Sequence, residues 1–309
     1  STISIISQVW LASSGLPEKR DPFTIYAFSN LGSFLALLSY PFIFEYYFDL
    51  DQQVGMWRIG YFLFLLLYFL TLLKVSVGKY CKFADSDDNT ISGGPEYSGK
   101  SLEKFYWFLL SAAGSILFLS VTNVITYEIT PCPLLWVIPM CLYLLSFTLT
   151  FKQRPFCPDW IKEKIHLWVG FSVLLFFLTQ INILPILVVI STYFIFLFIL
   201  CIFCQHKLYQ SRPGEKKDLT TFYLIIALGG FVGSFLVTWL APLVFTSPLE
   251  YLFGLFIIVL TLNMREKNVN RAGLFYYLVI LLIVLTLFWW PLVFRYYNFF
   301  GLVIILCVF

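Results

Sequence analysis

Polar side chains inside long apolar runs are the residues of this chain most able to do chemistry. Asn30 and Asn123 both lie within such runs, each beside further Ser or Thr residues on one helical face. Polar groups are costly to bury in lipid, so they serve either as hydrogen-bonding contacts between helices or as part of a path for a solute. Both interpretations stay open, and interhelical hydrogen bonding is the preferred one.

A second set of charged residues lies at the ends of apolar runs that we expect to face outward. Because few charges lie on this side, Glu45, Glu128 and Arg295 could pair at one outward-facing site. Anchoring at the membrane interface explains each residue separately and is the preferred alternative. The candidate site residues are therefore Asn30, Glu45, Asn123, Glu128, Glu250 and Arg295.

Other residue types that carry chemistry give weaker signals. Cys201 and Cys204 have the spacing of a redox or metal pair, but the seven cysteines are scattered, and we interpret these two as small buried thiols. His166 and His206 lie at helix ends, where they are poor haem ligands. The aspartates of 85–88 lack the spacing of a calcium loop. We predict no metal and no cofactor, and we find no phosphate-binding loop or catalytic set, so whether the chain is an enzyme stays open.

The apolar runs that position these residues predict an all-α membrane protein. The chain is 60% hydrophobic and only 12% charged, which is typical of a polytopic membrane protein. Helices satisfy their own backbone hydrogen bonds in lipid, and the alternating strands of a barrel are not seen. We predict one membrane domain over 1–309, a transmembrane helical bundle of about ten spans. The predicted spans are 23–44, 57–76, 105–125, 133–151, 167–183, 185–204, 222–244, 250–264, 273–289 and 291–309.

Basic residues occur in every second connection and predict the orientation of these spans. Of the 20 Lys and Arg residues, all but Arg58 and Arg295 lie on one side. Cytoplasmic loops carry the excess of Lys and Arg, so this side and both ends are predicted to be cytoplasmic. The net charge of +3 therefore needs no nucleic-acid partner. Residues 79–104, rich in Asp, Ser and Gly, are predicted to form a flexible cytoplasmic loop.

The two ends indicate a fragment of a longer chain. The sequence begins with Ser1 and stops at Phe309 inside an apolar run, and residues 1–20 lack the features of a signal peptide. Natural processing of the N-terminus is the alternative explanation.

Several stretches resemble a known group of bacterial membrane proteins. The matching residues are Asp21-Pro22-Phe23, 26–33 with Tyr40-Pro41, 133–139 with Tyr143-Leu144, and 212–251 with Gly229, Gly230 and Gly233. In order and spacing they resemble the spermidine synthase-like proteins, also described as fused major-facilitator/spermidine synthase proteins. The resemblance implies a bacterial plasma-membrane protein with further helices upstream and, in many members, a cytoplasmic Rossmann-type domain downstream. One departure is that Cys204 is followed by Gln205 before His206, whereas the group tends to place Cys and His side by side.

Three functions remain as hypotheses. The leading one is a membrane scaffold or anchor subunit, with the lipid bilayer and other membrane subunits as partners and without a closed central cavity. The second is a transporter of a small metabolite, with a cationic one as an option, which requires a polar cavity near Asn30 and Asn123. The third is the membrane part of an aminopropyl- or methyl-transferring enzyme.

Overall fold

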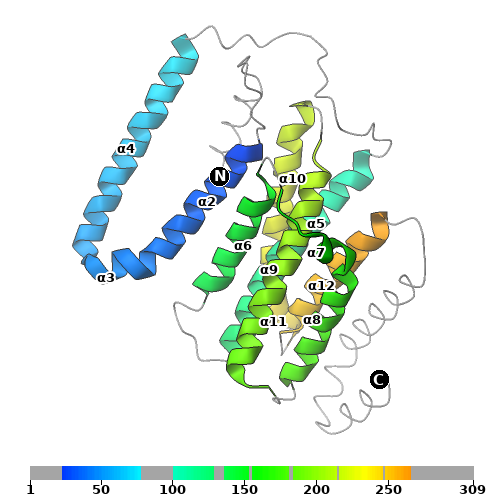
Figure 1. Cartoon of the computed structure of the whole chain (residues 1–309). Coiled ribbons are helices and arrows are strands. Elements are labelled where there is room, and N and C mark those ends of the chain that lie inside the picture. Colours follow the sequence, from blue (N-terminus) through cyan, green and yellow to red (C-terminus); the bar gives the residue numbers. More distant parts are fainter. Residues whose placement is uncertain are drawn as a thin grey trace, which may run out of the picture.

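The structure, a computed structural model, describes residues 23–77, 100–128, 136–152, 155–180, 184–213, 216–245 and 248–265. Within these ranges every regular element is a helix, so the predicted all-α fold is confirmed there. Figure 1 shows the elements in chain order. They are α2 (Phe23–Ser39), η1 (Tyr40–Phe44), α3 (Glu45–Tyr47), α4 (Leu50–Val77), α5 (Lys100–Glu128), α6 (Val137–Thr150), α7 (Asp159–Glu163), α8 (Ile165–Gln180), α9 (Ile186–Gln210), α10 (Lys216–Phe235), η2 (Leu236–Leu240), α11 (Ala241–Val244) and α12 (Glu250–Arg265).

Helices occupy the first eight predicted spans, and their ends show what the hydropathy pattern misses. α4 begins at Leu50 rather than 57, and the side-chain amide of Gln53 in its first turn donates hydrogen bonds to the carbonyls of Phe44 and Phe48 in the preceding turn. Among the described residues, five helices are long and apolar enough to cross a membrane: Ala27–Tyr47, Leu50–Leu73, Ser101–Tyr127, Ile186–Gln210 and Thr220–Val244. α6, α8 and α12 are shorter apolar helices. The last two predicted spans and most of the loop 79–104 lie outside the described residues.

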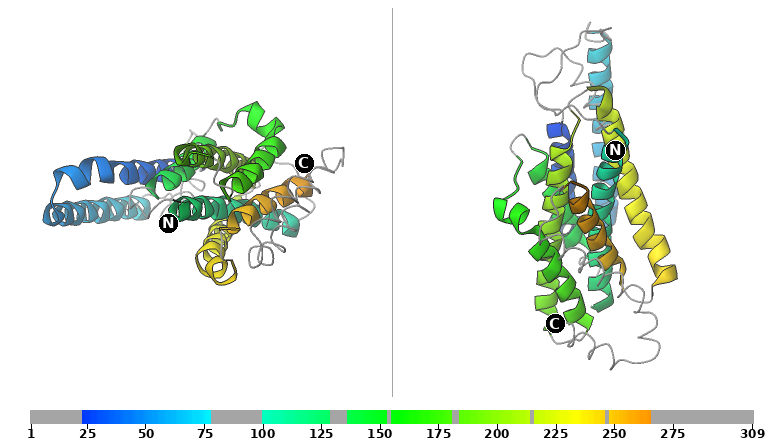
Figure 2. Two further views of the ribbon diagram at one scale, coloured as in Figure 1. Left: turned by 90° about the horizontal axis from the view of Figure 1, so that it is seen from below. Right: turned by 90° about the vertical axis from the view of Figure 1, so that its right-hand side faces the viewer.

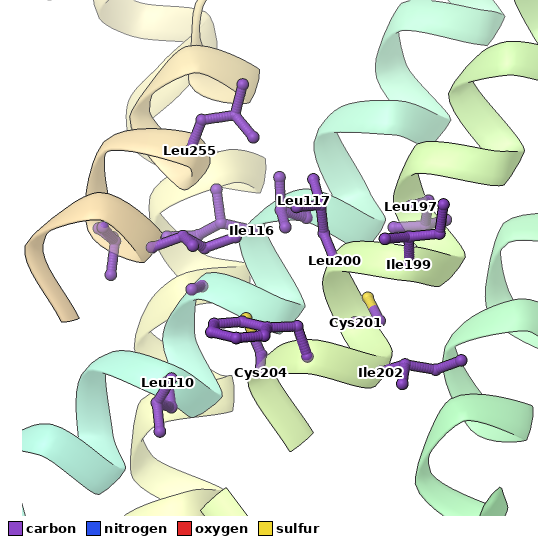
Figure 3. Close-up of a cluster of buried hydrophobic side chains, with 14 of the residues drawn as sticks. Leu110, Ile116, Leu117, Leu197, Ile199, Leu200, Cys201, Ile202, Cys204 and Leu255 are labelled. Atoms are coloured by element: carbon purple, nitrogen blue, oxygen red, sulfur yellow. The ribbon is translucent and has the colours of Figure 1, made fainter. Parts of the chain in front are cut away.

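The hydrophobic core is built around α5. This helix packs against α9, α10 and α12, and 72% of its apolar window is buried. Figure 3 shows Ile116 and Leu117 of α5 between Leu255 of α12 and Leu200 of α9. All four side chains are fully buried, so α5 lies at the centre of the helical bundle.

Glycines let α10 approach α5 closely. A Cβ atom on Gly229 would lie 2.5 Å from the Phe108 carbonyl oxygen, and one on Gly233 would lie 2.7 Å from the Ala112 carbonyl oxygen. The hydroxyl of Ser111 donates a hydrogen bond to the Ile226 carbonyl, with 2.7 Å between the oxygens. Close backbone approach with small residues and interhelical hydrogen bonds is how helices associate in lipid, where apolar burial alone gives little driving force.

The N-terminal hairpin, defined as α2 through α4 (23–77), stands apart from this core. α2 packs against α6, whereas α4 makes no extensive contact with any other described element. The views in Figures 1 and 2 agree that α4 projects to one side of the bundle. Its turn is held by Gln53, whose amide donates to the carbonyls of Phe44 and Phe48 at 3.2 and 2.8 Å. The hairpin is therefore a locally braced arm with an open outer face.

Candidate functional site

The polar site joins two residues that the sequence analysis named separately. The Asn123 side-chain amide, on α5, donates a hydrogen bond to Glu250 Oε1, on α12, with 3.0 Å between the atoms. Glu250 is 7% exposed and is the first residue of its helix. The positive end of the helix dipole favours a carboxylate there. The amide and the helix end thus stabilise a carboxylate that would otherwise be costly to bury.

A small pocket opens beside this pair. Its volume is about 130 Å³, and its lining adds to Asn123 and Glu250 the residues Tyr127, Ala241, Pro242, Phe245 and Pro248. Asn123 and Tyr127 lie one turn apart on α5, so they present neighbouring side chains. Just before the pocket the chain of α10 passes through the π-helix η2, and such turns are frequent at functional sites. The pocket combines a carboxylate, an amide and aromatic walls, which is suited to a small hydrogen-bond donor or cation.

Two of the other predicted site residues, Asn30 and Glu45, do not line this pocket. Asn30 lies half-buried on α2, and Glu45 begins α3 at the exposed turn of the N-terminal hairpin. Glu128 is the last residue of α5, and its side chain is not described. Arg295 lies outside the described residues, so its predicted pairing with Glu45 and Glu128 remains a prediction.

A buried hydroxyl network was not anticipated from the sequence. Ser172 of α8 hydrogen-bonds the hydroxyl of Tyr251 on α12, and Thr179 of α8 hydrogen-bonds the hydroxyl of Tyr193 on α9 at 3.3 Å. The two tyrosine rings meet edge to face with centroids 5.3 Å apart, and both are fully buried. The seven-residue spacing of Ser172 and Thr179 on one helical face was the available signal. The network joins three helices beside the polar site, because Tyr251 follows Glu250 directly.

The CxxC pair has no exposed face. Cys201 and Cys204 are free thiols with 0% and 1% exposure, and they lie among the core side chains in Figure 3. This placement agrees with their interpretation as small buried thiols. In the part of the chain that the structure describes, no group of three or more His, Cys, Asp or Glu residues could hold a metal ion.

Among the described residues, more than half of the exposed large hydrophobic side chains belong to the N-terminal hairpin. Only 6% of the Ala27–Tyr47 window and 0% of the Leu50–Leu73 window are buried, against 72% for Ser101–Tyr127. Exposed rings follow one another along α4, where Trp57 and Tyr61 stack with ring centroids 5.5 Å apart. This surface is suited to contact with lipid or with another membrane helix.

No protein-family model, curated protein or solved structure matches the chain. Membership of the spermidine synthase-like group therefore remains a prediction from the quoted residues.

Proposed function

We propose that the chain is a scaffold or anchor subunit of a larger assembly in the bacterial plasma membrane, with its basic loops in the cytoplasm. The observation that carries this proposal is the N-terminal hairpin, whose two arms are long enough to span a membrane and have almost no buried residues. The rest of the bundle satisfies its own packing around α5. Among the described hairpin residues only Ala27 belongs to the buried core, so the natural role of the exposed hairpin surface is contact with another polypeptide.

The shape of α4 favours a protein partner over lipid alone. Lipid chains adapt to any apolar surface, so a lipid-facing helix has no need of particular ring shapes. α4 instead presents the stacked pair Trp57 and Tyr61 and, one turn farther on, the stacked pair Phe64 and Tyr68. Tryptophan and tyrosine are the residue types enriched where interfaces are strongest.

The test is native mass spectrometry of the full-length protein released from its own membranes in mild detergent. Trp57 and Tyr61 are replaced together by leucine, which lipid tolerates but a shape-matched partner does not. The matched control is Phe171→Leu, at an exposed ring on α8. We expect a complex of defined larger mass for the wild type and the control, and its loss in the double variant. A wild type that runs as the single chain with lipid, or a double variant that keeps the complex, would contradict the scaffold function.

Transport of a small cation is the second candidate, and the polar site is the observation that favours it. The transporter hypothesis requires a polar cavity near Asn30 and Asn123, and the pocket is lined by Asn123 but not by Asn30. Reconstituted full-length protein would be tested for uptake of labelled primary amines by proteoliposomes. Transport predicts saturable uptake that Glu250→Gln abolishes, and uptake equal to that of empty liposomes would exclude it for these substrates.

A further inference from the structure

Two stretches of the chain repeat one another. Residues 32–49 align without a gap with residues 233–250, each position paired with the one 201 residues later, and six of the 18 pairs are identical. Both stretches follow the pattern Gly-Ser-Phe-Leu, then five residues, then Pro and, three residues on, Phe. The last aligned position is acidic in both, Asp49 in the first and Glu250 in the second. Self-similarity of this kind is the signature of a repeated structural unit.

The folded elements repeat as well. Each stretch carries one of the two π-helices among the described residues, η1 at Tyr40–Phe44 and η2 at Leu236–Leu240. In the alignment η2 corresponds to residues 35–39, directly before η1. A short helix and a turn follow in each, and the next helix begins at Leu50 or at Glu250, within one aligned position. We call α10 through α12 (216–265) the second hairpin. The two hairpins therefore share a sequence pattern and an order of elements.

Each copy buries the face that the other leaves open. Ala27 of α2 is buried, whereas its counterpart Leu228 on α10 is 48% exposed. Gly233 of α10 lies against the backbone of α5, whereas a Cβ on its counterpart Gly32 would meet nothing within 4 Å. The packing of the second hairpin at Gly233 is therefore a guide to what the first can receive at Gly32, whereas the counterpart of Gly229 is the exposed ring of Phe28.

The second hairpin holds α5 between its two arms. Gly233 of α10 meets Ala112, and Glu250 of α12 accepts the hydrogen bond from Asn123. Ala112 and Asn123 are eleven residues apart on α5, which is roughly 16 Å along a helix. The bound helix is thus recognised by a small residue at one level and a hydrogen-bond donor at another.

We propose that the open face of the N-terminal hairpin binds a transmembrane helix of another polypeptide in the way that the second hairpin binds α5. This inference rests on the proposed scaffold function and names the chemistry of the partner. The partner helix carries a small residue, Gly, Ala or Ser, against Gly32. About eleven residues farther on it carries an amide or cationic donor for Asp49, since hydrogen bonds to a carboxylate are the strong ones. The charge of the turn fits such a donor, because Glu45, Asp49 and Asp51 are all exposed there.

A second copy of the chain cannot present α5 to this face, because Ala112 and its neighbours are already buried in their own fold.

The probe is a synthetic peptide with the sequence of residues 101–128, which holds the small residue and the amide at the required spacing. Full-length protein labelled at the α3–α4 turn is reconstituted in phosphatidylcholine/phosphatidylglycerol liposomes, and energy transfer from labelled peptide is measured against peptide-to-lipid ratio. Two peptide variants form the matched pair. Ala112→Leu blocks the face that meets glycine, and Gly114→Leu changes the other face, where the native neighbour is Tyr143 of α6.

We expect saturable binding of the parent peptide and of Gly114→Leu, and binding weakened at least about tenfold by Ala112→Leu in the peptide or Gly32→Leu in the protein, as overpacking requires. Loss of part of the affinity is expected for Asn123→Leu in the peptide. Absence of parent binding, or equal binding by the Ala112→Leu and Gly114→Leu peptides, would overturn the proposed partner chemistry. If the native complex survives while the peptide fails, the scaffold function stands and this inference alone falls.

Discussion

Adding one methyl group at matched glycines tests the packing that this structure assigns to its helices. The series is Gly229→Ala, Gly254→Ala and Gly32→Ala. At Gly229 the new Cβ would lie 2.5 Å from the Phe108 carbonyl oxygen, which belongs to the backbone and cannot rotate away. At Gly254 it would meet side-chain atoms of Ile116 and Leu117 at 3.0 and 3.1 Å. At Gly32 it would meet nothing within 4 Å.

The three environments predict three different changes in stability. An alanine gains about 1 kcal/mol over glycine inside a helix. At Gly229, overpacking costs about 1–3 kcal/mol, and we expect the upper end because α10 must move as a whole away from α5. The net loss at Gly229 is therefore about 2 kcal/mol, whereas Gly32→Ala is neutral or gains up to about 1 kcal/mol. Gly254→Ala falls between them, because side chains yield more readily than backbone.

The assay is unfolding of the purified protein in mixed micelles of increasing SDS content, followed by tryptophan fluorescence and far-UV circular dichroism. The midpoint should fall clearly for Gly229→Ala and stay or rise for Gly32→Ala. Equal midpoints for these two variants, or a loss at Gly32 as large as at Gly229, would refute the packing of α10 on α5 and the open face of α2.

Three further changes probe the site, the hairpin and a buried thiol. Asn123→Leu leaves the buried carboxylate of Glu250 without its amide partner and should lower the free energy of unfolding by about 1–3 kcal/mol in the same assay. If Asn123→Leu costs the same in the wild type and in a Glu250→Gln background, the two side chains are not coupled. Gln53→Leu removes both hydrogen bonds that brace the hairpin turn, so distances between spin labels on α2 and α4 should broaden, and an unchanged distribution would contradict the bracing role. Burial raises the pKa of the Cys157 thiol, and the positive charges of Lys162 and Lys207 lower that pKa by a smaller amount. Less thiolate is therefore present at neutral pH, and its maleimide labelling should be slow and should accelerate at higher pH; fast labelling at pH 7 would show that the thiol is exposed.

The helices were predictable from hydropathy, because a span in lipid is defined by its own composition. The contacts between side chains of different helices were not predictable. Asn123 and Glu250 were each named from the sequence, but they are 127 residues apart, and nothing in a single sequence pairs them. Tyr251 and Ser172 escaped notice because a hydroxyl in an apolar run is compatible with lipid until a partner is known.

The exposure of the hairpin was equally hidden from the sequence. Leu50–Leu73 has a mean hydropathy of 1.8 and Ser101–Tyr127 one of 1.9, yet 0% of one window and 72% of the other are buried. Lipid tails and leucine side chains are similarly apolar, so composition does not tell a lipid-facing helix from a protein-facing one. The glycines held more information, since small residues four positions apart permit close approach of helices, and Gly229 and Gly233 allow it here.

Photo-crosslinking in the native membrane tests the scaffold function most directly. A benzophenone amino acid replaces Phe62 on α4 or, as control, Phe171 on α8, both exposed rings, in the full-length protein in living cells. The scaffold function predicts one discrete polypeptide adduct from position 62 and only lipid adducts from position 171. Lipid adducts alone from both positions, or a crosslink from 62 back into this same chain, would contradict it.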